Sequence, residues 1–386
     1  MKKFEIKIKD QIQVVAKPQT NSLKIILNPL LLRFYFWMIR LLAIVTFILL
    51  SQTANGQYLE DEIFQFLKLP ANARTTAFGG QQVAFYDADV QLVANNAAQL
   101  TDTLHQHFIF SNMFVPAGIQ SGNLAYTHHF KKGFNGMASL QFVNYGNFTE
   151  TDVNANELGE FSAVDLALNI GGSWQKGHWV FGATTKLIYS AIDNYGANAV
   201  ALDAGLIWQK KRTSFGATIK NFGAITNSFS ELETDEKLPL DIQLGFSQRL
   251  QHVPFRFSVN MHNLHRWNIR YDDPTQQQNS NIFGEEQQQK STWADEMFRH
   301  FIFSGEFYLG KPLSIQFAYN HKRAQEMRFA QRKGLAGFSF GLGINTKKFD
   351  FNYGIGVLSS AGSYHHLTIS THLSAWKNKK KKKIDS

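Results

Sequence analysis

Histidine is the residue type in this sequence with the widest chemical potential, as a general base or a metal ligand. The chain has 13 His, among them His105 with His107 and the adjacent pairs His128-His129 and His365-His366. On a strand, residues two apart share a face, so His105 and His107 could bind one metal ion, whereas adjacent residues point to opposite sides. No carboxylate or third His stands at a matching spacing. We therefore expect structural or rim histidines and no metal site.

Motifs for covalent catalysis and for phosphate binding are missing. The sequence contains no Gly-x-Ser-x-Gly, the context that exposes the nucleophile of many serine hydrolases. It contains no Cys, which excludes a thiol nucleophile, a disulfide framework and a cysteine-bound metal. Gly79-Gly80 and Gly171-Gly172 lack the Lys-Ser/Thr of a phosphate loop. We expect neither enzymatic activity nor a cofactor.

The net charge of +9 suggests nucleic acid or a membrane surface as a partner until it is divided along the chain. Residues 1–56 hold eight Lys and Arg against two Asp and Glu, and residues 377–386 hold six Lys against one Asp. The 320 residues between them carry 25 basic and 27 acidic side chains. Because this central part is not basic, we expect no nucleic-acid partner. The basic tail, 377–386, is either a solvated end or a contact for an anionic surface.

Residues 1–56 have the features of a secretory signal region. The apolar run Leu41–Leu50 follows two Arg and is followed by small and polar residues up to Gly56. Its ten residues are too few for a transmembrane helix, which needs about 20. We therefore predict cleavage between Gly56 and Gln57, with Met38 as the true start. A signal anchor is the alternative.

From about residue 105 onward, apolar and polar residues alternate, which is the period of a strand with two different faces. In Leu313–Asn320, for example, Leu, Ile, Phe and Tyr alternate with Ser, Gln, Ala and Asn. The alternating segments have roughly ten residues, the length of a strand tilted across a bilayer. Fourteen strands are predicted, at 105–114, 120–130, 133–145, 160–174, 178–190, 198–209, 213–221, 237–249, 253–264, 298–309, 313–321, 334–345, 349–359 and 364–373.

The length of a predicted connection depends on whether it follows an odd-numbered or an even-numbered strand. Those after even-numbered strands are short and basic, and most of those after odd-numbered strands are longer, at 146–159, 191–197, 222–236, 265–297 and 322–333. Short turns on the periplasmic side and long loops outside are typical of outer-membrane barrels. We therefore predict an all-β fold, a 14-stranded antiparallel transmembrane barrel surrounded by outer-membrane lipid in a Gram-negative bacterium. Both termini are expected in the periplasm.

The long loops are the candidates for docking a partner. The longest, 265–297, is rich in Gln, which favours a mobile exposed loop over an ordered lid. Near its end, Trp293–Arg299 is a possible short helix. The candidate docking residues are Glu231, Glu233, Asp235, Glu236, Asp272, Asp273 and Trp293.

Residues 57–104 do not alternate, and they contain Gly79-Gly80, where the backbone is free to adopt a positive φ. An ordered segment ahead of a barrel too wide to be filled by its own side chains predicts a plug, or hatch. The chain then divides into the signal region 1–56, the plug 57–104, the barrel 105–376 and the tail 377–386. The charged residues expected inside the barrel, beneath the plug, are Asp165, Asp203, Asp241, Arg256 and Glu306.

A run of short motifs lies within residues 67–97: LKLPANAR, AFGG, Asp-Ala-Asp and Asn-Asn-Ala. Together they resemble the amino-terminal signature of the PorV/PorQ family, outer-membrane proteins of the type IX secretion system of Bacteroidetes, within the superfamily of the fatty-acid transporter FadL. The resemblance covers nearly all of residues 57–376. One departure is Asn96, where family members usually have Pro. The hatch-motif residues are Leu69, Pro70, Ala73, Arg74, Gly79, Gly80, Asp87, Asp89, Asn95, Asn96 and Ala97.

The resemblance implies a non-enzymatic component of the type IX secretion machinery. Such a protein would anchor a PorZ-like surface protein and act with the sortase PorU and with PorV in an attachment complex that links cargo to lipopolysaccharide. The alternatives are a PorV-like cargo shuttle and a FadL-like transporter of hydrophobic compounds, which would require an apolar pocket under the hatch and a gap in the wall. An outer-membrane enzyme would require a nucleophile and a base that converge on one inner face.

Overall fold

The computed structural model describes residues 62–87, 89–130, 133–229, 236–270, 292–310, 312–327, 334–359 and 362–377, all within the unit Glu60–Ser386. Several predictions lie outside these residues: the cleavage site at Gly56-Gln57, the tail beyond residue 377, and the docking candidates Glu231, Glu233, Asp235, Asp272 and Asp273. Within the described residues, no helix has the length and apolar character needed to cross a membrane.

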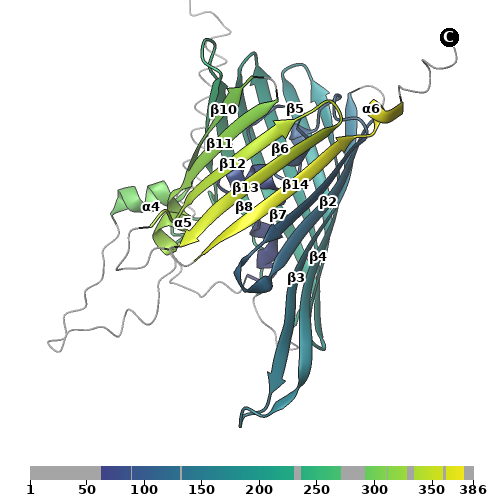
Figure 1. Ribbon diagram of the computed structural model, residues 1–386, viewed down its shortest axis with the longest axis vertical. Coiled ribbons are helices and arrows are strands. Elements are labelled where there is room, and N and C mark those ends of the chain that lie inside the picture. Colours follow the sequence, from purple (N-terminus) through teal and green to yellow (C-terminus); the bar gives the residue numbers. More distant parts are fainter. Residues whose placement is uncertain are drawn as a thin grey trace, which may run out of the picture. The chain divides into compact units, whose positions relative to one another are not determined.

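Fourteen antiparallel strands close into a barrel in which each strand pairs with its sequence neighbours and β1 pairs with β14 (Figure 1). The strands are β1 (His107–Phe114), β2 (Gln120–His129), β3 (Phe134–Thr151), β4 (Glu157–Lys176), β5 (Trp179–Ile192), β6 (Tyr195–Lys210), β7 (Thr213–Asn227), β8 (Asp241–Arg249), β9 (Phe255–Met261), β10 (Phe301–Leu309), β11 (Leu313–Asn320), β12 (Phe338–Asn345), β13 (Phe349–Ser359) and β14 (Gly362–His372). The predicted fold class is confirmed.

The predicted strand ends are wrong mainly at the end of the barrel that carries the long connections, which we call the outer end. The predicted loop 146–159 is mostly strand, because β3 runs to Thr151 and β4 begins at Glu157. β7 likewise extends to Asn227, into the predicted loop 222–236. The last residues of β3 are exposed on both faces. A strand without a buried face has no alternation for the sequence to show.

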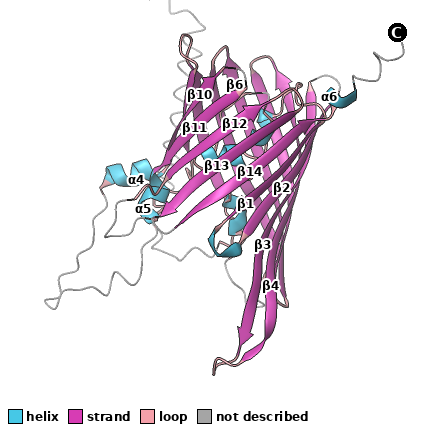
Figure 2. Cartoon of the chain, in the orientation of Figure 1, coloured by secondary structure: helices cyan, strands magenta, loops and turns pink. Residues whose placement is uncertain are grey.

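The helices are short and lie in three places (Figure 2). Before the barrel are η1 (Gln65–Lys68), α3 (Ala73–Ala77), η2 (Val90–Leu92) and η3 (Ala97–Gln99). At the outer end are η4 (Pro116–Gly118), α4 (Trp293–Arg299) and α5 (His321–Glu326), and α6 (Ser374–Lys377) follows β14. The structure has the helix proposed at Trp293–Arg299, whereas the predicted loop 322–333 begins within α5. That helix starts where the Asn320 side chain accepts a hydrogen bond from the Arg323 backbone amide.

The wall has two different faces. Its inward side chains are largely polar and buried, such as Ser111, Thr184 and Gln243. Its outward side chains are largely apolar and exposed, such as Phe181 at 45% and Leu187 at 51%. Exposed apolar surface of this extent is not stable in water. It fits a barrel immersed in a lipid bilayer.

Residues 62–87 and 89–104 lie inside the barrel, and we call the segment 62–104 the plug (Figure 1). Wall glycines let the plug backbone come close. A Cβ added at Gly182 would lie 2.2 Å from the Ala98 nitrogen, and one at Gly216 would lie 2.1 Å from the Val83 carbonyl oxygen. Alanine at either position would therefore collide with the plug.

Candidate functional site

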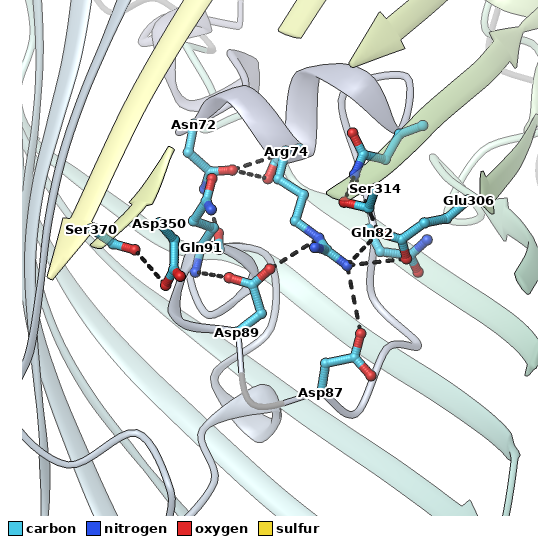
Figure 3. Close-up of polar contacts among 12 residues, drawn as sticks. Asn72, Arg74, Gln82, Asp87, Asp89, Gln91, Glu306, Ser314, Asp350 and Ser370 are labelled. Atoms are coloured by element: carbon cyan, nitrogen blue, oxygen red, sulfur yellow. Dashed lines mark hydrogen bonds and ion pairs between the residues drawn. The ribbon is translucent and has the colours of Figure 1, made fainter. Parts of the chain in front are cut away.

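The most strongly charged part of the lumen surrounds Arg74, which α3 carries in the plug (Figure 3). Its Nη2 lies 3.0 Å from Glu306 Oε1 on β10, and its Nε lies 3.0 Å from Asp89 Oδ2. Asp87 Oδ2 is 3.6 Å from Nη2. The side chains of Arg74 and Glu306 are 6% and 0% exposed, so these charges interact away from bulk water.

A second arginine, Arg256 on β9, joins the same group. Its Nη2 donates to Asp87 Oδ1 over 2.8 Å, and its guanidinium carbon lies 4.3 Å from the centre of the Phe85 ring. Tyr308 donates to Glu306 Oε2 over 2.6 Å. Two arginines therefore face three carboxylates across the boundary between plug and wall. Because a buried charge needs a partner, this group ties the plug to β9 and β10.

The hatch-motif residues give the plug the backbone that this group requires. Asn72 caps α3 by accepting from the Thr75 amide over 2.9 Å, and Asp89 caps η2 by accepting from the Gln91 amide over 2.9 Å. Gly79 has φ 84°, and a Cβ there would lie 2.7 Å from Ile302 Cγ2 on the wall. Leu69 and Pro70, between η1 and α3, complete the turn into Ala73. The motif therefore specifies turns and close contacts.

Asn96 stands where the resembled family usually has Pro, and the structure shows the consequence of the change. Asn96 has φ −155°, which a proline ring, fixed near −65°, cannot adopt. Its side chain instead caps η3 by accepting from the Ala98 amide over 2.9 Å, and it donates to the Val83 carbonyl over 3.1 Å. Neighbouring Asn95 donates to Thr75 Oγ1 over 2.8 Å. Side-chain hydrogen bonds thus order this turn.

One serine and one histidine meet on the inner face, as an enzyme would require. Ser111 Oγ lies 2.8 Å from His366 Nε2, but the other ring nitrogen of His366 faces Thr76 Oγ1 at 3.0 Å and no carboxylate. Ser111 and His366 are 0% and 1% exposed beneath the plug. A substrate has no access to this serine, so the pair links wall and plug rather than forming a catalytic dyad.

Several other histidines form ring contacts near the short-turn end. His107 stacks on His372 with ring centres 4.0 Å apart, and His105 lies 4.6 Å from His128. His105 and His107 therefore contact different partners and do not form the pair that the spacing allowed. Among the described residues, no group of three or more His, Asp or Glu has the arrangement of a metal site.

Within the described residues, the pairing of β7 with β8 ends before the outer half of β7. The ladder between β7 and β8 ends at the pair of Lys220 and Asp241, whereas the ladder between β6 and β7 continues to Asn227. Asn221 has φ 59°, and the pairing of β6 with β7 shifts register between Leu202 and Ala204. Among the residues that the structure describes, the last seven of β7 therefore have a strand neighbour on one side only.

An open pocket of about 590 Å³ lies at this gap, and we call it the wall pocket. One of its lining residues, Leu238, also belongs to an apolar cluster in the lumen, and another, Ile225, packs against that cluster. The plug side chains Phe64, Phe66 and Leu67 fill that cluster and pack against small wall residues. The wall pocket thus borders an apolar interior that the chain itself occupies. The wall members of the cluster are Val143, Ala167, Ile188, Ala197, Ala199, Ala201 and Leu238.

At the short-turn end lies a second open pocket of about 510 Å³, whose lining includes Asp87, Arg249 and Arg256. Two spaces between plug and wall measure about 30 and 10 Å³, far less than either open pocket. The plug therefore separates an apolar opening in the wall from a charged opening at the short-turn end.

Two candidate docking residues lie within the described part of the chain. Glu236 lines the wall pocket and accepts a hydrogen bond from Ser228. Trp293, in α4, is 68% exposed. The structure does not bring these two residues into one site.

The charged residues expected inside the barrel do line the lumen. Asp165 accepts from Tyr145 over 2.6 Å, and Asp203 pairs with Lys186 over 2.8 Å. Asp241 accepts from Gln243 over 2.6 Å. The sequence reasoning missed the pairing of Arg74 with Glu306 and the apolar cluster around Phe66. The inward Ala residues of β6, where other strands place polar residues, are the signal that could have revealed the cluster.

Neither a protein-family model nor a curated protein matches this sequence. Among solved structures, the chain is similar to the toluene transporter TodX of Pseudomonas putida, with 12% identity and a TM-score of 0.46 over 78% of this chain and 97% of that one. The toluene transporter TbuX of Ralstonia pickettii gives 9% and 0.45 over 79% and 97%, and a FadL homologue of Pseudomonas aeruginosa gives 8% and 0.43 over 78% and 98%. At such identities and TM-scores the likeness carries no argument about function.

Proposed function

We propose that this protein is an outer-membrane passage for small hydrophobic compounds, which enter from the membrane through the wall pocket. The observation that carries the proposal is that Leu238, a member of the apolar cluster of the lumen, and Ile225, which packs against that cluster, both line the wall pocket. A compound dissolved in the outer leaflet would move from lipid to apolar side chains without crossing water. Its polar exit would be the second pocket, beside Arg249 and Arg256.

The geometry described here is the closed state of such a passage. Phe64, Phe66 and Leu67 occupy the space that a compound would need, and Gln141 holds this segment by donating to the Phe66 carbonyl over 3.2 Å. Transport therefore requires the plug segment to move. The volume of the wall pocket is within the range of pockets that bind small molecules.

The test compares two tryptophan variants in an uptake assay. Ala224 lines the wall pocket, whereas Ala183 is an exposed residue in the apolar belt on β5. Ala224→Trp should reduce the uptake of a labelled hydrophobic compound by cells that depend on this protein, and Ala183→Trp should leave it unchanged. Equal uptake by both variants and the wild type would refute entry at the wall pocket.

A second candidate is the surface scaffold implied by the resemblance, in its PorQ-like form. Strands β3 to β7 have 14 to 20 residues, whereas β8 to β12 have 7 to 9. The β3–β4 hairpin therefore extends beyond the neighbouring wall (Figure 2). Its tip exposes apolar side chains, with Val153 at 101% and Leu158 at 63%. Apolar side chains raised in this way are suited to docking a protein.

The scaffold proposal covers a PorZ-like protein, PorU and PorV as partners, with lipopolysaccharide as the acceptor of cargo. Its test is the double variant Val153→Ser, Leu158→Ser, after which a PorZ-like surface protein should appear in the medium. If the double variant retains that protein and Ala224→Trp loses uptake, the results support the passage as the function and exclude the scaffold. If the double variant releases the protein and Ala224→Trp has normal uptake, they support the scaffold and exclude the passage.

A further inference from the structure

The helices α4 and α5 pack together outside the wall, beside the outer ends of β10 and β11 (Figure 1). Asp295 joins them, because its Oδ1 lies 3.0 Å from His321 Nε2 while its Oδ2 accepts from Arg299 Nε over 2.8 Å. The Phe298 ring lies 6.1 Å from the His321 ring. We call the helices α4 and α5, together with Trp267, the helical foot.

The aromatic side of the helical foot continues the aromatic face of the wall. The Phe298 ring lies 6.2 Å from Phe301 and 6.4 Å from Phe303, and Phe303 belongs to the outward face at 39% exposure. The ring of His321, the first residue of α5, lies 5.9 Å from that of Tyr319 on β11, and the Tyr319 ring lies 4.9 Å from that of Phe338 on β12. The foot therefore adjoins the belt that contacts lipid.

Two indole rings are exposed on the foot. Trp293 is 68% exposed and Trp267 is 50% exposed, and their rings stack 6.4 Å apart. Phe298 is 42% exposed. Meanwhile Asp295 and Arg299 pair with each other rather than with solvent. Indole rings are enriched at membrane interfaces, where one side meets hydrocarbon and the other meets water.

We propose that the helical foot rests in the headgroup region of the outer leaflet, with Trp293 and Phe298 at the boundary of the acyl chains. Lipid is the occupant, because the patch is continuous with the lipid-facing wall, and helices with one apolar face lie in this plane of a membrane. This binding surface is independent of the passage and of the scaffold. It would fix the depth of the barrel in the membrane on the side of β10 and β11, whereas the β3–β4 hairpin extends beyond the neighbouring wall.

The test is fluorescence quenching in vesicles whose phosphatidylcholine carries bromine on the acyl chains. The emission of Trp293 is the difference between the full chain and its Trp293→Phe variant. We expect bromine near the headgroup to remove most of this emission and bromine near the methyl end to remove much less. Emission that neither lipid quenches, but that aqueous iodide quenches, would overturn the proposal and point to a protein partner.

Two further variants serve as controls. Trp179, 45% exposed on the wall at the other end of the barrel, gives a matched difference signal that brominated lipid should quench. Asp295→Asn keeps both indoles and weakens the contact between the helices, so it should shift Trp293 from lipid quenching toward iodide quenching. Unchanged lipid quenching in Asp295→Asn would show that the helix pair does not position Trp293, and would overturn that part of the proposal. Resistance of the folded barrel to heat in detergent gels establishes that each variant is folded.

Discussion

Replacing Arg74 by Met should release the plug, because it leaves Glu306 and Asp89 buried without their common partner. Arg74 lies 3.0 Å from each carboxylate, and its side chain is 6% exposed. Removing one member of a buried ion pair costs about 3–5 kcal/mol. Since about 1.4 kcal/mol corresponds to a factor of ten, the population of the opened plug should rise by a factor between about 100 and about 4,000.

The assay uses the fact that the chain has no Cys. Ser258 lies on the wall beneath the plug, is 2% exposed and accepts a hydrogen bond from Gln82 Nε2 over 2.9 Å. In Ser258→Cys, a water-soluble thiol reagent can react only when the plug moves away. Its rate of labelling should increase by the same factor when Arg74→Met is added.

The matched control is Lys186→Met. Lys186 also forms a largely buried ion pair, with Asp203 over 2.8 Å, but both partners belong to the wall. This variant should not change the labelling rate at residue 258. A rate in Arg74→Met within a factor of about three of the parent, or an equal increase in Lys186→Met, would refute the reasoning that these ion pairs hold the plug.

Three other outcomes follow from the structure. Gly182→Ala and Gly216→Ala should each raise labelling at residue 258, because the added Cβ meets plug backbone at 2.2 and 2.1 Å, whereas Gly196→Ala, with its nearest atom at 3.8 Å, should not. Glu306→Gln added to Arg74→Met should restore part of the plug closure, since it removes a buried negative charge that Arg74 no longer balances; an additive effect in the double-mutant cycle would contradict the pairing. Burial alone would raise the pKa of Asp295, but hydrogen bonds from His321 and Arg299 hold this pKa below its usual range. The stability that Asp295 contributes to the contact between α4 and α5 is therefore fully present above the ordinary Asp pKa of about 3.9, and it is lost as the pH falls through the lower pKa of the folded protein. Trp293 emission measured against pH should show this transition, and the transition should be missing in Asp295→Asn.

The sequence predicted the barrel well because each wall strand has one lipid face and one polar face. In Leu313–Asn320 the apolar residues that alternate in the sequence are those that point outward. The same reasoning failed beyond residue 145, where the end of β3 is exposed on both faces and no physical constraint imposes alternation.

The interior was harder to predict, because contacts between plug and wall join residues far apart in the chain. Arg74 and Glu306 are 232 positions apart, and no local period relates them. The sequence did show that each of these residues needs a partner, since a charged side chain inside the barrel must be paired. Which residue supplies the partner depends on how the plug turns at Gly79 and at Asn96, and that backbone is determined by packing against the finished wall.

The course of the plug also affects how the barrel is assembled. The first described residues lie at the outer end, where the Ile63 amide donates to the Lys237 carbonyl over 3.1 Å, and the plug then runs through the lumen to β1. Its backbone touches glycines on strands spread around the circumference, at Gly182, Gly216 and Gly354. The plug can thus serve as a template that sets the curvature of the sheet, with the pairing of β1 and β14 completing the barrel around it. We expect a chain without residues 62–104 to acquire its heat-resistant form more slowly, and an unchanged rate would show that the wall curves without a template.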